Sequence, residues 1–227
     1  FKVVEGETGD SAANKQKAEF LMGKTLHKLK FYSAALTFFD RIVQKGAAHP
    51  HYNETLKWLA SLSREVADSA GVLDKIGKYD KKELDQPALE SVRDELYFLL
   101  GKYNYNKGKF KEAVELFNAV PAKSEFYVQA KLFEGATHVR EYKAQPAVES
   151  FKEVLRASTE NPKAKPYEDL ANLSLARTFY STGQYDLAVK YFDRVSTDSY
   201  DWPNSLFEAS WANFMLKHAG YSKARGN

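Results

Sequence analysis

Small, apolar and aromatic residues recur in the same order along this chain, and the repeats that begin at 94 and 128, and at 169 and 203, are 34 residues apart. The stretch YNKGKFKEAVELFNAVP at 105–121 returns as YSTGQYDLAVKYFDRVS at 180–196, with Tyr, Gly, an aromatic residue, Ala, Val, Phe and Val kept in place. Related stretches at 27–43 and 139–155 align on the same alanine and phenylalanine. A period of this length predicts one helix–turn–helix element per repeat, each stacked on its neighbours.

Three positions of the repeat predict how its two helices pack. We number positions from the expected repeat starts at residues 16, 94, 128, 169 and 203. Position 8 is small: Gly23, Gly101, Gly135, Ala176 and Ser210. Position 20 is alanine and position 24 is phenylalanine in the first four of these repeats: Ala35, Ala113, Ala147 and Ala188; Phe39, Phe117, Phe151 and Phe192. Small residues let two helix backbones approach, and the ring fills the wedge beside them.

The segments LLGKYNYNKGKFKEAVELF and LARTFYSTGQYDLAVKYF resemble the tetratricopeptide repeat in this pattern of small, small and aromatic positions. The likeness is weaker in the repeat at 128, where Lys131 and His138 stand in places that are usually aromatic or aliphatic. It is also weaker in the repeat at 16, where Lys30 replaces the glycine of the turn. The resemblance implies an all-α fold, a right-handed superhelical solenoid of antiparallel helix pairs with about five to six repeats, the last one truncated.

The repeat pattern also predicts how the chain is divided. Residues 1–15 are expected to form a flexible leader, because they are rich in Gly, Glu and Ser. Repeats are expected near 16–49, 50–83, 94–127, 128–161 and 169–202, the second of them degenerate, with a partial repeat at 203–227. Polar, proline-containing linkers are expected near 80–93 and 158–168. The pattern breaks off at YSKARGN, which favours a fragment of a longer array.

The tetratricopeptide resemblance further implies where a partner would bind. Positions 2, 5, 9 and 12 of the first helices would line a concave groove that holds an extended peptide or a helix. The candidate groove residues are Lys24, His27, Trp58, Phe98, Lys102, Tyr105, Arg177, Tyr180, Phe207 and Trp211. Cations among aromatic rings suit a protein or peptide ligand that carries carboxylates and apolar or proline-rich segments. The same aromatic residues could instead belong to the core, and the sequence leaves both interpretations open.

Composition and charge argue against other classes of partner. The chain of 227 residues has 33 basic and 30 acidic residues, and its net charge of +3 argues against a nucleic-acid surface. An RNA-reading repeat protein is further disfavoured by Glu54, Glu95 and Leu170 on the proposed inner face. The apolar runs are too short for a membrane-spanning helix.

The sequence also contains no strong catalytic or cofactor motif. The absence of cysteine excludes disulfides and thiolate metal ligands. GVLDKIGKY at 71–79 imitates a phosphate-binding loop, but its glycine spacing and its final tyrosine do not fit one. HPH at 49–51 brings two imidazoles without a third ligand. We therefore expect no enzyme activity, no cofactor and no metal site.

Together these observations predict a non-enzymatic protein–protein interaction scaffold. The alternative is a structural or assembly subunit that docks into a larger complex through its convex face and its ends. The segment SYDWPNSLFEASWANFML at 199–216 is similar to repeat proteins of bacterial cell envelopes. That similarity implies an adaptor in the periplasm or at the outer membrane, with the cytoplasm as the alternative location.

Overall fold

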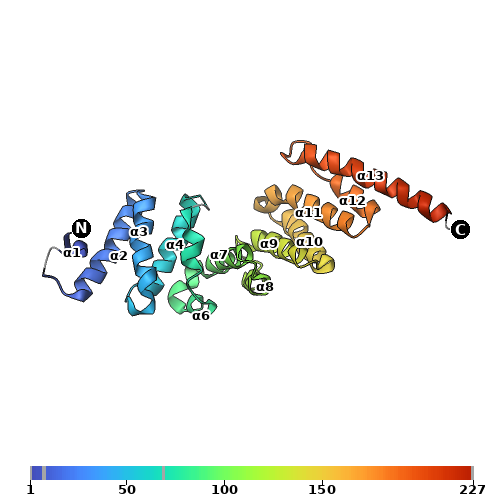
Figure 1. Ribbon diagram of the computed structural model, residues 1–227. Helices are drawn as coiled ribbons and strands as arrows, with labels where there is room; N and C mark the ends of the chain where they lie inside the picture. The colour runs from blue at the N-terminus through green and yellow to red at the C-terminus, as the bar shows by residue number, and fades with distance from the viewer. Residues whose placement is uncertain (1, 7–8, 68–69, 226–227) are drawn as a thin grey trace. The chain divides into compact units, whose positions relative to one another are not determined.

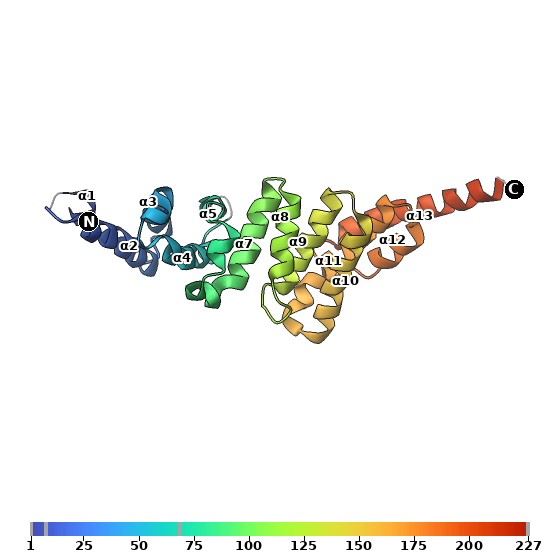
Figure 2. The ribbon, with the colours of Figure 1, turned by 90° about the horizontal axis from the view of Figure 1, so that it is seen from below.

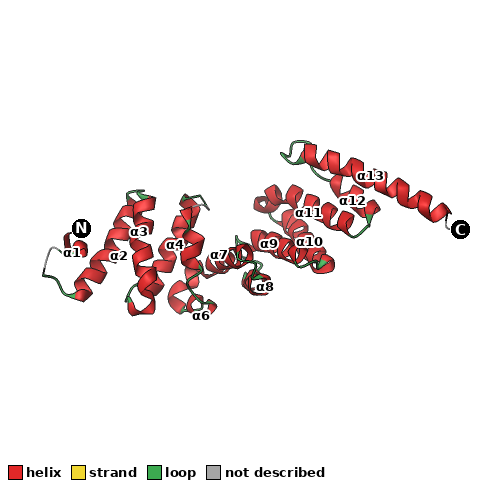
Figure 3. Ribbon diagram, viewed as in Figure 1, coloured by secondary structure: helices red, strands yellow, loops and turns green. Residues whose placement is uncertain are grey.

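The structure, a computed structural model, describes residues 2–6, 9–67 and 70–225. Helices joined by turns and short loops make up this part of the chain, and no β-strand occurs in it (Figure 3). The prediction of an all-α fold is therefore confirmed. The chain divides into two compact parts, Phe1–Val120 and Pro121–Asn227, which we call the N-terminal part and the C-terminal part.

In the N-terminal part, helix pairs flank a more irregular segment. Its helices are α1 Lys2–Glu5, α2 Ala12–Lys28, α3 Tyr32–Lys45, η1 Gly46–Ala48, α4 Tyr52–Glu65, α5 Val72–Ile76, α6 Lys81–Leu84, η3 Pro87–Val92, α7 Arg93–Asn106 and α8 Phe110–Ala119. α2 pairs with α3 (Figure 1), and α7 pairs with α8 (Figure 2). Ser11 caps α2 by accepting a hydrogen bond from the Asn14 N–H, so this helix begins before residue 16, the expected start of the first repeat.

In the C-terminal part, helix pairs are followed by one long helix. Its helices are α9 Tyr127–Arg140, α10 Ala144–Glu160, η4 Pro162–Tyr167, α11 Glu168–Ser181, α12 Tyr185–Phe192 and α13 Trp202–Arg225. α9 pairs with α10, α11 pairs with α12, and α13 packs against α12 (Figure 1). The 3-10 helix η4 occupies the linker that the sequence predicts near 158–168 and packs against α10 and α11.

The same contact joins the two helices of each pair. A phenylalanine ring of the second helix lies so close to the first that a Cβ atom added to Gly23, Gly101 or Gly135 would be 2.5–2.7 Å from a ring carbon. Ala176 holds this position in the fourth pair, where both it and Phe192 are buried. Positions 8 and 24 thus pack as the sequence predicts, and in the three pairs with glycine at position 8 a larger side chain would displace the ring.

The first helix of each pair ends in a left-handed turn at position 15. The φ angle there is 63° at Lys30, 72° at Gly108, 59° at Tyr142 and 74° at Gly183. The following residue donates a backbone hydrogen bond to the carbonyl five residues earlier, as Lys143 does to His138 at 2.9 Å. This Schellman arrangement satisfies carbonyls at the helix end. Lys30 and Tyr142 hold it without glycine, at a conformational cost of about 1–2 kcal/mol each.

Shorter elements replace the second helix expected in the repeat at 50–83. Helix α5 has only five residues, and α6 and η3 follow it before α7. The Tyr52 and Tyr79 rings stack with centroids 4.2 Å apart, and the Tyr79 hydroxyl donates to the Tyr52 carbonyl at 2.8 Å. Burial raises the pKa of Tyr52 to about 12 and also raises that of Tyr79, so both hydroxyls remain protonated. Gly77 lies against the Tyr103 ring of α7, so this glycine of GVLDKIGKY has a packing role.

Helix α13 departs from the turn pattern. Its residue at position 15 is Lys217, which lies inside the helix, and the helix continues to Arg225. The first helix predicted for the repeat at 203 is present, but it runs through the place where the other first helices turn back. Phe207 and Phe214 of this helix are 64% and 52% exposed.

We expect Gly101→Ala to destabilise the protein by about 1–3 kcal/mol, because the added methyl group overpacks the contact with Phe117. At an exposed helix position the same change would stabilise by about 1 kcal/mol, so the sign is diagnostic. Chemical denaturation followed by circular dichroism measures it. Adding Phe117→Leu, which trims the ring, should shrink the loss caused by the alanine. A Gly101→Ala variant more stable than the parent would contradict the contact.

We expect Tyr142→Gly to stabilise the protein by about 0.5–1 kcal/mol, because glycine adopts a positive φ without steric cost. The Tyr142 side chain is 96% exposed, so its removal loses little packing. The matched control is Lys143→Gly at the next residue, where φ is −99° and glycine should not stabilise. Thermal unfolding measures the melting temperatures of the two variants. A lower melting temperature for Tyr142→Gly than for the parent would show that the positive φ angle at Tyr142 does not cost stability.

Candidate functional site

The first helices of the N-terminal part bring three of the predicted groove residues together. The Lys24 ammonium of α2 lies 5.0 Å from the Phe20 ring centroid and 5.3 Å from the Trp58 ring centroid of α4. It is also 3.9 Å from a Glu54 carboxylate oxygen. The His27 and Trp58 rings meet edge to face at 5.2 Å. Lys24 therefore already lies against two rings and a carboxylate.

The surroundings of His27 keep its imidazole neutral at neutral pH. Burial lowers the pKa of His27 below its ordinary value, and the Glu65 carboxylate offsets this only in part. The imidazole Nε2 lies 3.1 Å from the Ser61 hydroxyl oxygen of α4. The Tyr32 hydroxyl donates to Glu65 at 2.9 Å, which raises the pKa of Tyr32. The inner side of α2 and α4 is thus a connected aromatic and polar cluster.

On α7, the predicted groove residues belong partly to the core. Phe98 is only 5% exposed, and its ring packs 6.3 Å from that of Phe117. The Lys102 ammonium lies 5.8 Å from the Phe98 ring centroid, and the Tyr105 ring lies 6.1 Å from the Phe110 ring of α8. Phe98 is therefore a core residue rather than a contact surface, whereas Lys102 and Tyr105 remain half-exposed at the helix face.

In the C-terminal part, Arg177, Tyr180 and Trp211 come together between α11 and α13. With Glu208 and Phe192 they line a recess of about 190 Å³. Arg177 donates two hydrogen bonds to the Glu208 carboxylate, from Nε at 2.8 Å and from Nη2 at 2.6 Å. This bond to Glu208 raises the pKa of Arg177. The cation predicted to meet a ligand is thus already paired within the chain.

A second, larger recess lies between α9 and α11. Its volume is about 360 Å³, and most of its lining is apolar: Gln129, Leu132, Phe133, Ala136, Phe151, Tyr167, Leu170 and Ser174. The Gln129 amide donates to the Tyr167 hydroxyl oxygen at 2.7 Å across one side. Sequence reasoning placed Leu170 on the inner face but missed the recess. The sequence feature that indicates this recess is a small residue, Ala136, at position 9 of the repeat, close to the aromatic Phe133.

Phe207, the last of the predicted groove residues, lies on the exposed face of α13. Neighbouring Trp211 is 51% exposed, and its ring meets that of Phe214 edge to face at 5.9 Å. Trp211 lines the smaller recess, whereas Phe207 does not. The ten predicted residues therefore fall into an α2–α4 cluster, an α7 set and an α11–α13 set.

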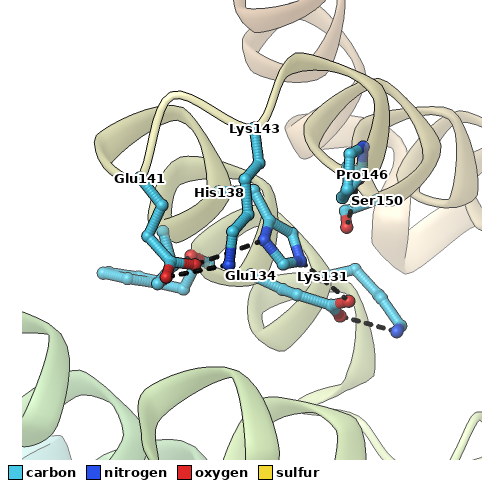
Figure 4. Close-up of polar contacts among 9 residues, drawn as sticks. Lys131, Glu134, His138, Glu141, Lys143, Pro146 and Ser150 are labelled. Atoms are coloured by element: carbon cyan, nitrogen blue, oxygen red, sulfur yellow. Dashed lines mark hydrogen bonds and ion pairs between the residues drawn. The ribbon is translucent and has the colours of Figure 1, made fainter. Parts of the chain in front are cut away.

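A chain of charged side chains follows one face of α9 and the turn after it (Figure 4). The Lys131 ammonium donates to Glu134 at 2.6 Å. The His138 Nε2 and Nδ1 atoms lie 3.9 Å from Glu134 and 3.6 Å from Glu141. The Lys143 ammonium donates to Glu141 at 3.0 Å. Two lysines thus balance two glutamates around one histidine.

This α9 network occupies repeat positions that are buried and mostly apolar on α11. Positions 4, 7 and 11 are Lys131, Glu134 and His138 here, whereas α11 has Asn172, Leu175 and Phe179. The nearby Ser150 hydroxyl donates to the Pro146 carbonyl at 3.0 Å rather than to the imidazole (Figure 4). The hydroxyl is therefore not arranged as a nucleophile activated by His138.

The HPH segment lies against α2, where its histidines pack. The Glu19 carboxylate, 4% exposed, accepts a hydrogen bond from Lys45 at 2.5 Å and lies 3.6 Å from the His49 Nε2. Burial lowers the pKa of His49, although the Glu19 charge opposes this. The His51 ring stacks on Phe20 at 4.4 Å. Among the residues the structure describes, no three His, Cys, Asp or Glu side chains form a group that could hold a metal ion.

The comparisons with known proteins bear on these repeats. A family model described as tetratricopeptide repeat matches residues 94–120, which span nearly all of α7 and all of α8. No curated protein matches the chain in sequence. In the part of the chain that the structure describes, no helix has the length and apolar character needed to cross a membrane.

Solved structures with a similar fold include two of MamA. One, described as the crystal structure of MamA protein, has a TM-score of 0.57 and 18% identity, over 79% of this chain and 89% of that chain. The other has a TM-score of 0.55 and 19% identity, over 77% and 92%. TTC0263, a thermophilic TPR protein of Thermus thermophilus, has 19% identity over 88% and 99%, but its TM-score of 0.41 is too low to support an argument. At these identities the MamA structures show the fold alone.

We expect the Arg177–Glu208 pair to contribute about 0.5–1 kcal/mol to stability, because both side chains remain partly exposed to solvent. A double-mutant cycle of Arg177→Ala and Glu208→Ala, followed by chemical denaturation, measures this coupling. The coupling should fall in high salt. A coupling energy near zero in low salt would show that the pair does not hold α11 and α13 together.

Proposed function

We propose that this chain is a non-enzymatic protein–protein interaction scaffold that holds a partner peptide or helix against the first helices of its stacked helix pairs, one of which matches the tetratricopeptide repeat model. Folds of stacked helix pairs present extended surfaces for protein partners. The proposal places the contact surface on the inner side of α9, α11 and α13.

The recess between α9 and α11 carries this proposal. Its volume of about 360 Å³ accommodates one or two large apolar side chains, and its lining is mainly apolar. The smaller recess at Trp211 lies on the next pair of first helices, α11 and α13. A peptide segment that follows these helices would place apolar residues in both recesses, with Trp211 as an aromatic anchor.

The charges on the inner sides of the first helices, in each of the two parts, restrict the partner. Lys24 and Arg177 each have a carboxylate partner inside the chain, Glu54 and Glu208. We propose an acidic or proline-containing ligand. A carboxylate of that ligand would have to compete with these two glutamates for the cations. Apolar burial in the larger recess needs no such exchange, and we take it as the main source of affinity.

An adaptor role in a bacterial envelope, in the periplasm or at the outer membrane, is the finer form of this proposal. Its support is the likeness of segment 199–216 to envelope repeat proteins. The cytoplasm is the alternative location. Cell fractionation of the native protein distinguishes the two.

The alternative function, a subunit that docks into a larger assembly, has its own supporting observation. Helix α13 exposes a face of large apolar residues that includes Phe207 and Trp211. Exposed apolar groups of this kind mark interaction sites more often than isolated apolar residues do. The two functions share Trp211 but differ at the recess between α9 and α11, which does not include α13.

We expect Ala136→Trp to abolish partner capture, because an indole at position 9 fills the recess between α9 and α11. The native full-length protein is used for affinity purification, and mass spectrometry identifies the proteins retained. The matched control is Gln145→Trp, which adds the same indole at an exposed site of the second helix α10. Both variants should keep the melting temperature of the parent.

The outcomes separate the two functions. Loss of partners in Ala136→Trp alone supports the inner face. Retention of the same partners in Ala136→Trp at undiminished yield would rule out this recess as the binding site and favour docking through another face.

A further inference from the structure

The turn between α2 and α3 exposes two large apolar residues side by side with two lysines. Leu29 is 60% exposed and Phe31 is 61% exposed, one on each side of the left-handed residue Lys30. All four residues from Lys28 to Phe31 are exposed. They form one short surface patch, which we call the KLKF turn.

The corresponding turns of the other helix pairs are polar at the same places. Positions 14 and 16 are Leu29 and Phe31 in the KLKF turn, whereas the other turns have Lys107 and Lys109, Glu141 and Lys143, or Thr182 and Gln184. All four turns share the left-handed backbone conformation at position 15. The turn itself therefore needs no apolar residue at positions 14 and 16, and packing between the helices does not account for Leu29 and Phe31.

The two lysines of the KLKF turn keep uncompensated charge. Among the residues that the structure describes, neither Lys28 nor Lys30 forms an ion pair. The nearby Glu65 carboxylate instead accepts a hydrogen bond from the Tyr32 hydroxyl at 2.9 Å. Lys24, on the inner side of the same helix α2, differs because it lies 3.9 Å from a carboxylate oxygen of Glu54. Positive charge and exposed apolar groups thus occur together in this turn.

This combination matches the surface of an anionic bilayer. Phosphate groups lie above the hydrocarbon there, so a lysine can meet a headgroup while a neighbouring apolar side chain enters the boundary below it. Each lysine close to such a surface strengthens binding about fivefold. An apolar or a basic signal alone holds a protein only marginally, and stable attachment takes both. The KLKF turn supplies both signals within four residues.

A protein partner fits the same turn less well. By themselves the four residues expose less than the roughly 800 Å² that each side of a stable protein–protein interface buries. A bilayer requires no complementary shape, so a small protruding turn can enter it. The attraction to headgroup phosphates would also weaken in high salt, because these charges lie at the surface.

We propose that the KLKF turn is a peripheral membrane contact, in which Leu29 and Phe31 insert into the interface of an anionic bilayer while Lys28 and Lys30 bind phospholipid phosphates. The contact is reversible, because only two side chains enter the bilayer. The turn belongs to α2 and α3, whereas the recess of the proposed function lies between α9 and α11. Ala136→Trp should therefore leave membrane binding unchanged, so the two proposals succeed or fail separately.

Sedimentation of the full chain with lipid vesicles tests the contact. We expect binding to phosphatidylcholine vesicles that contain about one third phosphatidylglycerol, reversal of that binding in high salt, and no binding to phosphatidylcholine alone. Leu29→Ser combined with Phe31→Ser should weaken binding about tenfold or more, because both apolar side chains are lost. No binding by the parent, or equal binding by this double variant, would overturn the proposal. So would loss of protein partners in the double variant without vesicle binding by the parent.

A matched pair of lysine variants separates this turn from general attraction between a basic chain and an anionic surface. Lys28→Gln combined with Lys30→Gln should weaken vesicle binding about tenfold or more. Lys109→Gln combined with Lys111→Gln removes the same charge at the turn between α7 and α8 and should change binding by less than about twofold. Lysines at all four positions are exposed, so circular dichroism should show unchanged folding. Equal weakening by the two double variants would refute a specific contact through the KLKF turn.

A site-specific dye tests insertion directly. The chain contains no cysteine, so Phe31→Cys can be labelled at one place with the environment-sensitive dye nitrobenzoxadiazole. Its emission should rise and shift to the blue on addition of the anionic vesicles. The same dye on Lys109→Cys, the equivalent position 16, should not respond. If the dye at residue 31 is shielded from an aqueous quencher before vesicles are added, another part of the chain or a second copy covers the turn, and the proposal is wrong.

Discussion

Close approach between a small residue and a phenylalanine ring is the constraint on which this fold depends. Where position 8 is glycine or alanine, the second helix lies against the first, and the ring at position 24 closes the space between them. The left-handed turn at position 15 brings the second helix back at the required place. The persistence of that turn at Lys30 and Tyr142, where no glycine relieves the strain, indicates that packing between the helices outweighs the local cost.

In each of the two parts, the cations on the inner sides of the first helices are already engaged within the chain. Lys24 lies against Phe20, Trp58 and Glu54, and Arg177 donates two hydrogen bonds to Glu208. These contacts join neighbouring first helices within each part, and in the C-terminal part the recess between α9 and α11 is largely apolar. The candidate site is therefore better described as a set of apolar recesses beside compensated charges than as a strip of free cations.

The sequence predicts the helix pairs well because their determinants are local and repeat. Positions 8, 20, 24 and the turn are fixed by spacing within one repeat, and even the irregular turn at Lys30 could be placed. Exposure at position 5 was not predictable in this way. Phe98 and Phe207 are the same residue at the same position, yet Phe98 is buried beside Phe117 of the second helix α8, whereas Phe207 is exposed and no helix among the described residues covers it. The Arg177–Glu208 pair joins residues 31 positions apart, and Tyr167 reaches the recess from a 3-10 helix outside the 34-residue pattern.

The internal pairing of Arg177 with Glu208 has a kinetic consequence. Long-range attraction speeds encounters only when a surface carries uncompensated charge, and such steering raises association rates well above the roughly 10⁵–10⁶ M⁻¹s⁻¹ of a neutral surface. A recess whose cation is already neutralised gives a ligand no such guidance. Selectivity at this face would then arise from how long a complex persists rather than from how fast it forms.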